Sequence, residues 1–152
     1  LKEIWPKILH YNSKAELHLA GKNMPKWLID KRDKNVYNHG DVSNAKDFMQ
    51  KYDIMLVPIL SAGGIRVKII EGMALGKTII STKIGAEGLS YVNNENILIA
   101  NSPDDFGKIS KTLFSKKDEL IRIGENARRH VLENYDQSNI SKKLISFFES
   151  FL

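Results

Sequence analysis

Hydrophobic positions along the chain switch between helical spacing and short, nearly continuous apolar runs. Apolar residues that recur every 3.6 residues predict amphipathic helices, and short β-branched runs bounded by turn residues predict strands. Strands are predicted at residues 15–20, 35–39, 54–57, 78–81 and 96–100. Helices are predicted at residues 1–11, 27–30, 44–51, 65–75, 104–114, 118–134 and 137–151.

Strands that alternate with helices favour a parallel sheet with right-handed crossovers. The run Ile54–Val57 is almost entirely apolar, which is typical of a strand covered on both faces. The pattern therefore predicts an α/β class, a Rossmann-like three-layer domain with helices on both faces of a parallel sheet. Ser43 is expected to cap the helix at 44–51, and Pro103 suits the first turn of the following helix region.

The 152 residues fit one domain, and the sequence shows no internal repeat or linker. Because the first predicted element is a helix, whereas a doubly wound domain normally begins with a strand, we expect the first strand to lie upstream of Leu1. The sequence has no cysteine, which excludes disulfides and thiolate metal sites. No apolar run reaches the ~20 residues of a membrane span and no signal peptide opens the chain, so we expect a cytoplasmic location.

The formal net charge of +5 has two interpretations. It attracts an anion, such as a nucleotide diphosphate, an anionic membrane surface or a nucleic acid, or it reflects a lysine-rich solvated surface. Basic and aromatic residues do not interleave along the chain, so we do not expect nucleic acid as a partner.

The loops that follow the strands are the places for chemistry, because ligands of open parallel sheets lie beyond the carboxyl ends of the strands. Residues 58–76 run from a strand through a small-residue loop into a helix. The helix start offers unpaired N–H groups and the positive end of a dipole. The positive charges of Arg66 and Lys68 are unfavourable at this end of the dipole, and the negative charge of a bound diphosphate would offset them. Ser61, Ala62, Gly63 and Gly64 would let a ligand approach the backbone.

Glu71 lies in an otherwise apolar stretch of this helix. A carboxylate in such a place needs donors, and the two hydroxyls of a ribose would supply them. Alternatively Glu71 faces solvent, or it pairs with Lys68 three residues earlier. Asp41, beside Gly40 after a predicted strand, is a loop cap or a contact to a bound base, and spacing alone does not decide.

The run GGIRVKIIEGMALGKTIISTKIGAEGL at residues 63–89 resembles the signature of glycosyltransferase family 4 and its close relatives. Segments on both sides agree with the same family: LHLAG at 17–21, VYNHGDV at 36–42, DIMLVP at 53–58, and ARR at 127–129 followed by Tyr135. The resemblance therefore covers nearly the whole chain. It implies one half of a GT-B fold, the C-terminal domain that binds the donor, over residues 1–152.

The resemblance also implies the roles of individual residues. Glu71 would bind the ribose of the nucleotide, and Gly40, Asp41 and Val42 would line the pocket for its base. It assigns no catalytic residue, no metal and no cofactor, the nucleotide-diphosphate sugar being a substrate. The residues expected to contact the donor phosphates and sugar are Ser61, Gly63, Gly64, Ile65, Arg66 and Lys68.

The implied reaction is retaining transfer of the sugar to an acceptor hydroxyl, in the synthesis of a polysaccharide or glycoconjugate. An N-terminal domain outside this chain would bind the acceptor sugar or lipid-linked glycan, and the upstream strand and its loop would add cations to the diphosphate site. The chain alone is therefore expected to bind the donor and hardly turn it over. Weak peripheral association with the inner face of an anionic membrane stays open.

Three positions depart from the family pattern. Family members commonly carry a second Glu eight positions before the ribose-binding one, where this chain has Gly63. A small residue there, together with Arg66, Lys68 and Glu71, resembles the branch associated with bacterial surface polysaccharides. Gly72 replaces the usual Ala, a helix-weakening change of about 1 kcal/mol that the sequence does not explain. Thr78 stands where Pro is usual.

Other functions are compatible with the same pattern. One is a non-catalytic nucleotide-binding α/β module, another is part of a nucleotide-sugar epimerase, and a third is a basic domain that binds an anionic membrane or nucleic acid. The four histidines are expected to be structural or on the surface rather than catalytic.

Overall fold

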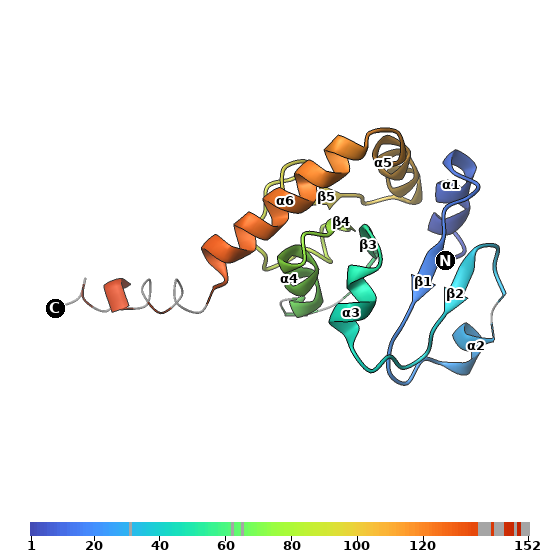
Figure 1. Cartoon of the computed structure of the whole chain (residues 1–152), viewed down its shortest axis with the longest axis horizontal. Coiled ribbons are helices and arrows are strands. Elements are labelled where there is room, and N and C mark those ends of the chain that lie inside the picture. The colour runs from blue at the N-terminus through green and yellow to red at the C-terminus, as the bar shows by residue number, and fades with distance from the viewer. Residues whose placement is uncertain are drawn as a thin grey trace.

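The computed structural model describes residues 1–30, 32–61, 63–64, 66–136, 141, 145–147 and 149 (Figure 1). Short strands alternate with helices in the first two thirds of the chain, and two long helices follow. The elements in chain order are α1 Ile4–Tyr11, β1 Leu17–Leu19, α2 Lys26–Ile29, β2 Val36–Asn38, α3 Ala45–Gln50, β3 Ile54–Val57, α4 Val67–Ala74, β4 Thr78–Ser81, β5 Leu98–Ile99, α5 Pro103–Ser115 and α6 Lys117–Asn134.

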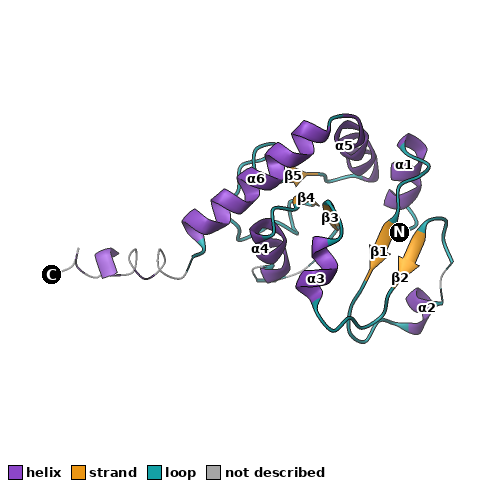
Figure 2. Ribbon diagram, viewed as in Figure 1, coloured by secondary structure: helices purple, strands orange, loops and turns teal. Residues whose placement is uncertain are grey.

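All strand pairs are parallel, which confirms the predicted α/β class. The strands form two sheets, however, where the sequence suggested one. One sheet pairs β1 with β2, and the other has the order β3-β4-β5 (Figure 2). The facing edges of β1 and β3 have no strand partner in the part of the chain that the structure describes.

Helices cover both faces of the three-stranded sheet. All four residues of β4 are buried, and successive side chains of a strand point to opposite faces. Ile79 packs with Ile69 and Met73 of α4 on one face. On the other face Ile80 packs in a cluster that contains Phe106 of α5. The helix α6 contributes to both clusters, with Ala127 and Val131 in the first and Ile123 in the second.

Close packing explains why position 72 of α4 is glycine. A Cβ on Gly72 would lie 2.8 Å from Sδ of Met55 and 3.0 Å from Cδ1 of Ile79, closer than the packed side chains allow. Alanine is the better helix former, but it does not fit between α4 and the sheet without displacing both neighbours. Alanine at this position would therefore require the ends of the Met55 and Ile79 side chains to shift.

The helix α1 packs alongside α5 (Figure 1). It thereby joins two halves of the molecule, one that contains the β1–β2 sheet and one that contains the β3-β4-β5 sheet. It buries Trp5 and Ile8, and the indole N–H of Trp5 donates to the carbonyl oxygen of Lys34 at 2.8 Å. Nζ of Lys7 lies 2.7 Å from a carboxylate oxygen of Asp104 on α5. The helix therefore links the β1–β2 sheet to α5, which covers one face of the β3-β4-β5 sheet.

Several element boundaries differ from the sequence-based prediction. Asn44, and not Ser43, caps α3, since its side chain accepts from the N–H groups of Lys46 and Asp47. The helix α4 begins at Val67, because the backbone of Arg66 is not helical. The predicted strand at 96–100 is reduced to Leu98–Ile99. Most of the helix predicted at residues 137–151 falls outside the described residues.

Candidate functional site

Most predicted site residues lie in the loops at the carboxyl ends of the strands, and Lys68 and Glu71 lie on α4. Because the strands within each sheet are parallel, the loop after β3 lies at the same edge as the loop after β4. The loop after β2 lies beside the end of β1 in the same way, and the N–H of Gly21 donates to the carbonyl oxygen of Gly40 at 2.8 Å. The site is therefore built on two separate sheet edges.

The loop between β3 and α4 is open on its outer side. Ser61, Gly63 and Gly64 are exposed, and a Cβ on either glycine would meet open space. Gly64 has φ +78°, a left-handed conformation that favours glycine. Ile65, predicted to contact the donor, lies outside the described residues.

The N-terminus of α4 has no side-chain cap and no acidic residue in its first turn. The first N–H that bonds within the helix is that of Ile69, which donates to the carbonyl oxygen of Arg66 at 2.8 Å. Uncapped N–H groups at the positive end of a helix dipole favour an anion. This end of α4 thus has the electrostatic character that the sequence predicts.

The Arg66 guanidinium folds back over the glycine loop. Its Nη1 donates to the carbonyl oxygen of Gly63 at 2.6 Å and also to that of Gly64. Its Nε and Nη2 are buried and have no hydrogen-bond partner among the described residues. A cationic donor left buried and unpaired is costly, so these two nitrogens favour an acceptor with negative charge.

Lys68 and Glu71 form the ion pair that their spacing allows. Nζ of Lys68 lies 2.6 Å from Oε2 of Glu71, and both side chains are partly exposed. Glu71 is half-buried in the surface of α4 and has no contact here that would distinguish a ribose ligand from a surface carboxylate. The structure therefore contains the Lys68–Glu71 ion pair, which was one of the alternatives that the sequence left open.

Two adjacent hydroxyls, of Ser81 at the end of β4 and of Thr82 directly after it, hold the loops after β3 and β4 together. They were not among the residues predicted from the sequence. The buried Thr82 donates through Oγ1 to the carbonyl oxygen of Ile59, and it accepts from the N–H of Gly85 at 2.9 Å. The hydroxyl of Ser81 donates to the carbonyl oxygens of Val57, at 3.4 Å, and Thr82, at 3.0 Å. Two adjacent hydroxyls that end a buried strand are a sequence signal for such a link.

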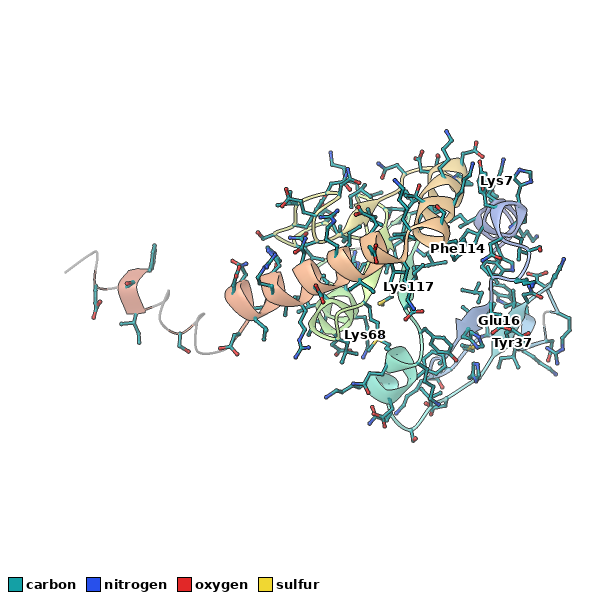
Figure 3. All side chains as sticks on the ribbon, turned by 45° about the horizontal axis from the view of Figure 1, so that its top comes forward. Lys7, Glu16, Tyr37, Lys68, Phe114 and Lys117 are labelled. Atoms are coloured by element: carbon teal, nitrogen blue, oxygen red, sulfur yellow. The ribbon has the colours of Figure 1, made fainter. Side chains whose placement is uncertain are left out.

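The predicted base pocket lies on the other sheet. Gly40 has φ +65°, Asp41 is exposed and Val42 is half-buried. Asp41, Val42 and Lys68 line one cavity of about 840 Å³ that separates the two sheets. In Figure 3 the same cavity is bordered by Phe114 of α5, Lys68 of α4 and Glu16 just before β1. The other predicted site residues that the structure describes do not line it: Gly40, Ser61, Gly63, Gly64, Arg66 and Glu71.

The histidines make structural contacts. His18 stacks between Tyr37 and Tyr52, with ring centroids 4.9 and 4.4 Å apart, and its Nδ1 lies 2.9 Å from Nε2 of His39. His130 contacts the carbonyl oxygen of Ser90 through Nε2. These contacts fasten α3 to the β1–β2 sheet and α6 to the loop after β4.

The described residues contain neither a candidate metal cluster nor a helix that could span a membrane. No group of three or more His, Asp or Glu side chains is placed to hold a metal ion there. No helix in that part of the chain combines the length and apolar character needed to cross a bilayer.

The sequence matches a known family over most of its length, and it is similar to two known proteins. Residues 1–116 match the family of glycosyl transferases group 1. An uncharacterised 44.6 kDa protein from the cps region of Klebsiella pneumoniae is 28% identical over 155 residues, which cover 96% of this chain and 39% of that protein. An uncharacterised glycosyltransferase of Methanocaldococcus jannaschii is 30% identical over 103 residues, or 62% of this chain and 29% of its own length. The chain thus spans well under half of these relatives.

Solved structures share the fold at low sequence identity. Anabaena HepE, solved in complex with UDP, is 13% identical with a TM-score of 0.75, over 97% of this chain and 45% of that one. The C-terminal domain of a glycosyl transferase group 1 family protein from Francisella tularensis is 19% identical with a TM-score of 0.71, over 90% of this chain and 82% of that one. The chain belongs to the glycosyl transferases group 1 family, and it has the Rossmann-like α/β fold of one domain of a GT-B glycosyltransferase.

Proposed function

We propose that this domain binds the nucleotide diphosphate of a sugar donor, with the diphosphate seated on the glycine loop and the N-terminus of α4. The observation that carries the proposal is the Arg66 guanidinium, which has two buried nitrogens with no acceptor among the described residues and lies beside a helix start without a side-chain cap. Phosphate oxygens supply charged acceptors in the geometry that a guanidinium fork prefers. Exposed Ser61, Gly63 and Gly64 leave the backbone accessible to the same ligand.

The ion pair of Lys68 with Glu71 fits a site that rearranges when the donor arrives. Both side chains are partly exposed and long enough to change partners. In the proposed complex Lys68 turns to the diphosphate, and the carboxylate of Glu71 is released to accept from the ribose hydroxyls. Gly40, Asp41 and Val42 on the neighbouring sheet edge contact the base. The UDP complex of Anabaena HepE, which shares the fold, makes UDP the first nucleotide to test.

The reaction of the natural polypeptide is then attack of an acceptor hydroxyl on the anomeric carbon, with retention of configuration. The leaving diphosphate gathers negative charge as the sugar–oxygen bond breaks. Fixed N–H groups and the Arg66 cation, aimed at that charge, lower the barrier without a bound metal. The family match supports a transferase, and the relative from a cps region supports a role in surface polysaccharide synthesis.

The acceptor, a sugar or lipid-linked glycan, is assigned to a second domain outside residues 1–152. This assignment is supported by the relatives, of which the chain spans 39% and 29%. Chain 1–152 alone is then expected to bind the donor without appreciable turnover. A cytoplasmic location and weak attachment to the inner membrane face remain predictions.

Calorimetric titration with UDP, GDP and ADP, without added metal, tests the donor site in the natural polypeptide that contains this chain. We expect one diphosphate to bind in preference to the others. Arg66→Ala should weaken that binding by about 1.5–3 kcal/mol, the contribution of a hydrogen bond to a charged group. Arg128→Ala, which removes an exposed arginine from α6, is the matched control and should leave the affinity unchanged. Equal affinities of the two variants would contradict the proposal.

The ribose contact has its own test. Glu71→Gln keeps the size of the side chain but loses the charge that strengthens hydrogen bonds from hydroxyls. We expect the variant to lose much of the preference for UDP over 2′-deoxy-UDP, as measured by the ratio of the two dissociation constants. An unchanged ratio would remove Glu71 from the ribose site and leave the diphosphate site in place.

A further inference from the structure

One face of α6 carries a row of polar side chains that bind the main chain of the loop after β4. The members of this polar row are spaced four residues apart, which places them on the same face of the helix: Arg122, Asn126 and His130. Nη2 of Arg122 donates to the carbonyl oxygen of Asn94 at 2.9 Å. Nδ2 of Asn126 donates to the carbonyl oxygen of Glu95 at 3.1 Å. The loop therefore lies along the helix for two of its turns.

The third member of the row, His130, acts together with Tyr135 on the peptide groups of Ser90. The N–H of Ser90 donates to Oη of Tyr135 at 2.9 Å, and its carbonyl oxygen contacts Nε2 of His130. Because a carbonyl oxygen can only accept, Nε2 carries the ring proton, and Nδ1 is left to accept from Nδ2 of Asn134 at 3.3 Å. Ser90 itself is exposed, so these two side chains hold it in place, and burial does not.

Apolar contacts fix the middle of the loop against the same helix. Ala86 is fully buried and Leu89 is almost fully buried. Both belong to the cluster that contains Ala127 and Val131 of α6. A shift of α6 against the sheet would therefore move this part of the loop with it.

The other end of the loop is bound to the segment that precedes Gly63 and Gly64. Oγ1 of Thr82 donates to the carbonyl oxygen of Ile59 and accepts from the N–H of Gly85 at 2.9 Å. Ile59 lies in the loop after β3, a few residues before the two glycines. The loop after β4 is thus bound to α6 at one end and to the loop after β3 at the other.

The segment around Gly63 and Gly64 depends on its ends for its position. Both glycines are exposed. Among the described residues, the hydrogen bonds to their carbonyl oxygens come from Arg66, which belongs to the same loop. The start of α4 fixes one end of this segment, and the bond from Thr82 to Ile59 fixes the other.

We propose that the polar row of α6, together with Tyr135, positions the glycine loop for the nucleotide diphosphate through the loop after β4. These are positioning residues, since none of them is among the residues proposed to contact the donor. The inference rests on the donor site proposed above, and it adds residues on a helix that contributes no ligand contact of its own.

Nucleotide affinity, compared with stability, tests the inference in the natural polypeptide that contains this chain. The double variant His130→Ala with Tyr135→Phe frees the peptide groups of Ser90 and keeps the aromatic ring that packs on the core. We expect its dissociation constant for UDP to rise about three- to tenfold, within the range by which substitutions along a connected network change the coupling of two sites. Calorimetry well below the melting temperature measures it. GDP or ADP replaces UDP if the unsubstituted protein binds that nucleotide more tightly.

A stability-matched variant separates positioning from a general loosening of the fold. Phe106 of α5 is buried in the cluster on the other face of the sheet. Phe106→Leu or Phe106→Ala, whichever loses the same melting temperature as the double variant, should leave the affinity for UDP unchanged. Equal affinities of the double variant and this control would overturn the inference and leave the donor site in place. Failure of the unsubstituted protein to bind any of the three nucleotides would overturn the donor site and the inference with it.

A conservative change at position 130 gives a readout that a merely structural role would not move. His130→Gln replaces the imidazole with an amide that can still donate to the carbonyl oxygen of Ser90. Combined with Tyr135→Phe, it should bind UDP more tightly than the double variant that has alanine at this position. If glutamine and alanine gave the same dissociation constant, the bond to Ser90 would not position the site, and the inference would be overturned.

Amide exchange without nucleotide tests whether the change at Ser90 reaches Thr82. The N–H of Gly85, which donates to Oγ1 of Thr82, should exchange faster in the double variant than in the unsubstituted protein. The stability-matched Phe106 variant should leave this amide as protected as before. Unchanged protection of Gly85 in the double variant would mean that the loop after β4 does not transmit the position of α6, and it would overturn the inference whatever the nucleotide affinities.

Discussion

The two sheets of this domain differ sharply in how well they are packed. Every residue of β4 is buried, with Ile79 and Ile80 fully enclosed by helices on either side. No residue of β1 or β2 is buried. The candidate phosphate and ribose residues follow the well-packed sheet, and the candidate base pocket follows the open one. A ligand that contacts both sheets would therefore be held on one side by the well-packed β3-β4-β5 sheet. On the other side it would be held by the β1–β2 sheet, whose position depends on the cavity between the sheets.

The difference in packing predicts a difference in the cost of truncation. Ile80→Ala should lower the free energy of unfolding by about 2–5 kcal/mol, because it leaves a hole in an enclosed core. Leu19→Ala, in half-buried β1, should cost only about 1 kcal/mol, since much of the side chain is already in contact with water. Urea denaturation of the two variants measures both values. Equal costs would show that the two halves are equally well packed.

The sequence predicts β3 and β4 of the well-packed sheet better than it predicts β5 or the two strands of the open sheet. The bounds of β3 and β4 match the prediction because continuous apolar runs fix both their type and their length. The division into two sheets was missed, since strand pairing depends on residues far apart in the chain and leaves no local periodicity. At the α3 start, Ser43 and Asn44 are both good caps, and only backbone geometry decides between them.

The candidate site also contains one contact that the sequence could predict and others that it could not. The Lys68–Glu71 pair follows from helical spacing, so the sequence could anticipate it. The contacts of Arg66 with the carbonyls of Gly63 and Gly64 depend on the course of an irregular loop. The link made by Thr82 requires two loops to meet. The Arg66 contacts leave no local pattern, and the adjacent hydroxyls of Ser81 and Thr82 signal a link without identifying the loop that they bond. The ligand roles of the site residues remain predictions.

Thr82 joins two loops of the well-packed half. Thr82→Val removes the hydroxyl that joins the loops after β3 and β4, and it leaves the carbonyl of Ile59 and the N–H of Gly85 without their partner. We expect a loss of about 1–3 kcal/mol in the free energy of unfolding, the cost of leaving buried polar groups unpaired. Thr82→Ser keeps the hydroxyl and should lose less. If both variants lost the same stability in urea, the hydroxyl would not be what joins the loops.

The smallest expected effect concerns the contact that joins the two halves on the surface. The Lys7 ammonium donates to the Asp104 carboxylate and holds the pKa of that carboxyl below its usual value, and the same bond raises the pKa of Lys7. A lowered carboxyl pKa stabilises the fold above the unfolded-state pKa of ~4 and ceases to do so as the pH falls through the folded-state value. A raised lysine pKa stabilises it below ~10.4 and ceases to do so as the pH rises further.

Asp104→Asn tests this contact. We expect a small loss of melting temperature at pH 7, because the pair is exposed and solvent screens it. The difference from the unsubstituted chain should shrink as the pH falls through the lowered folded-state pKa, because the carboxylate is then protonated in both states. The measurement is thermal unfolding from pH 2 to 8, with Asp118→Asn, an exposed aspartate in the first turn of α6, as the control. A constant difference down to pH 2 would mean that Asp104 acts through its size and position in α5. The charge of Lys7 would then contribute nothing to the packing of α1 on α5. It would also contribute nothing to holding the half with the β1–β2 sheet against the half with the β3-β4-β5 sheet.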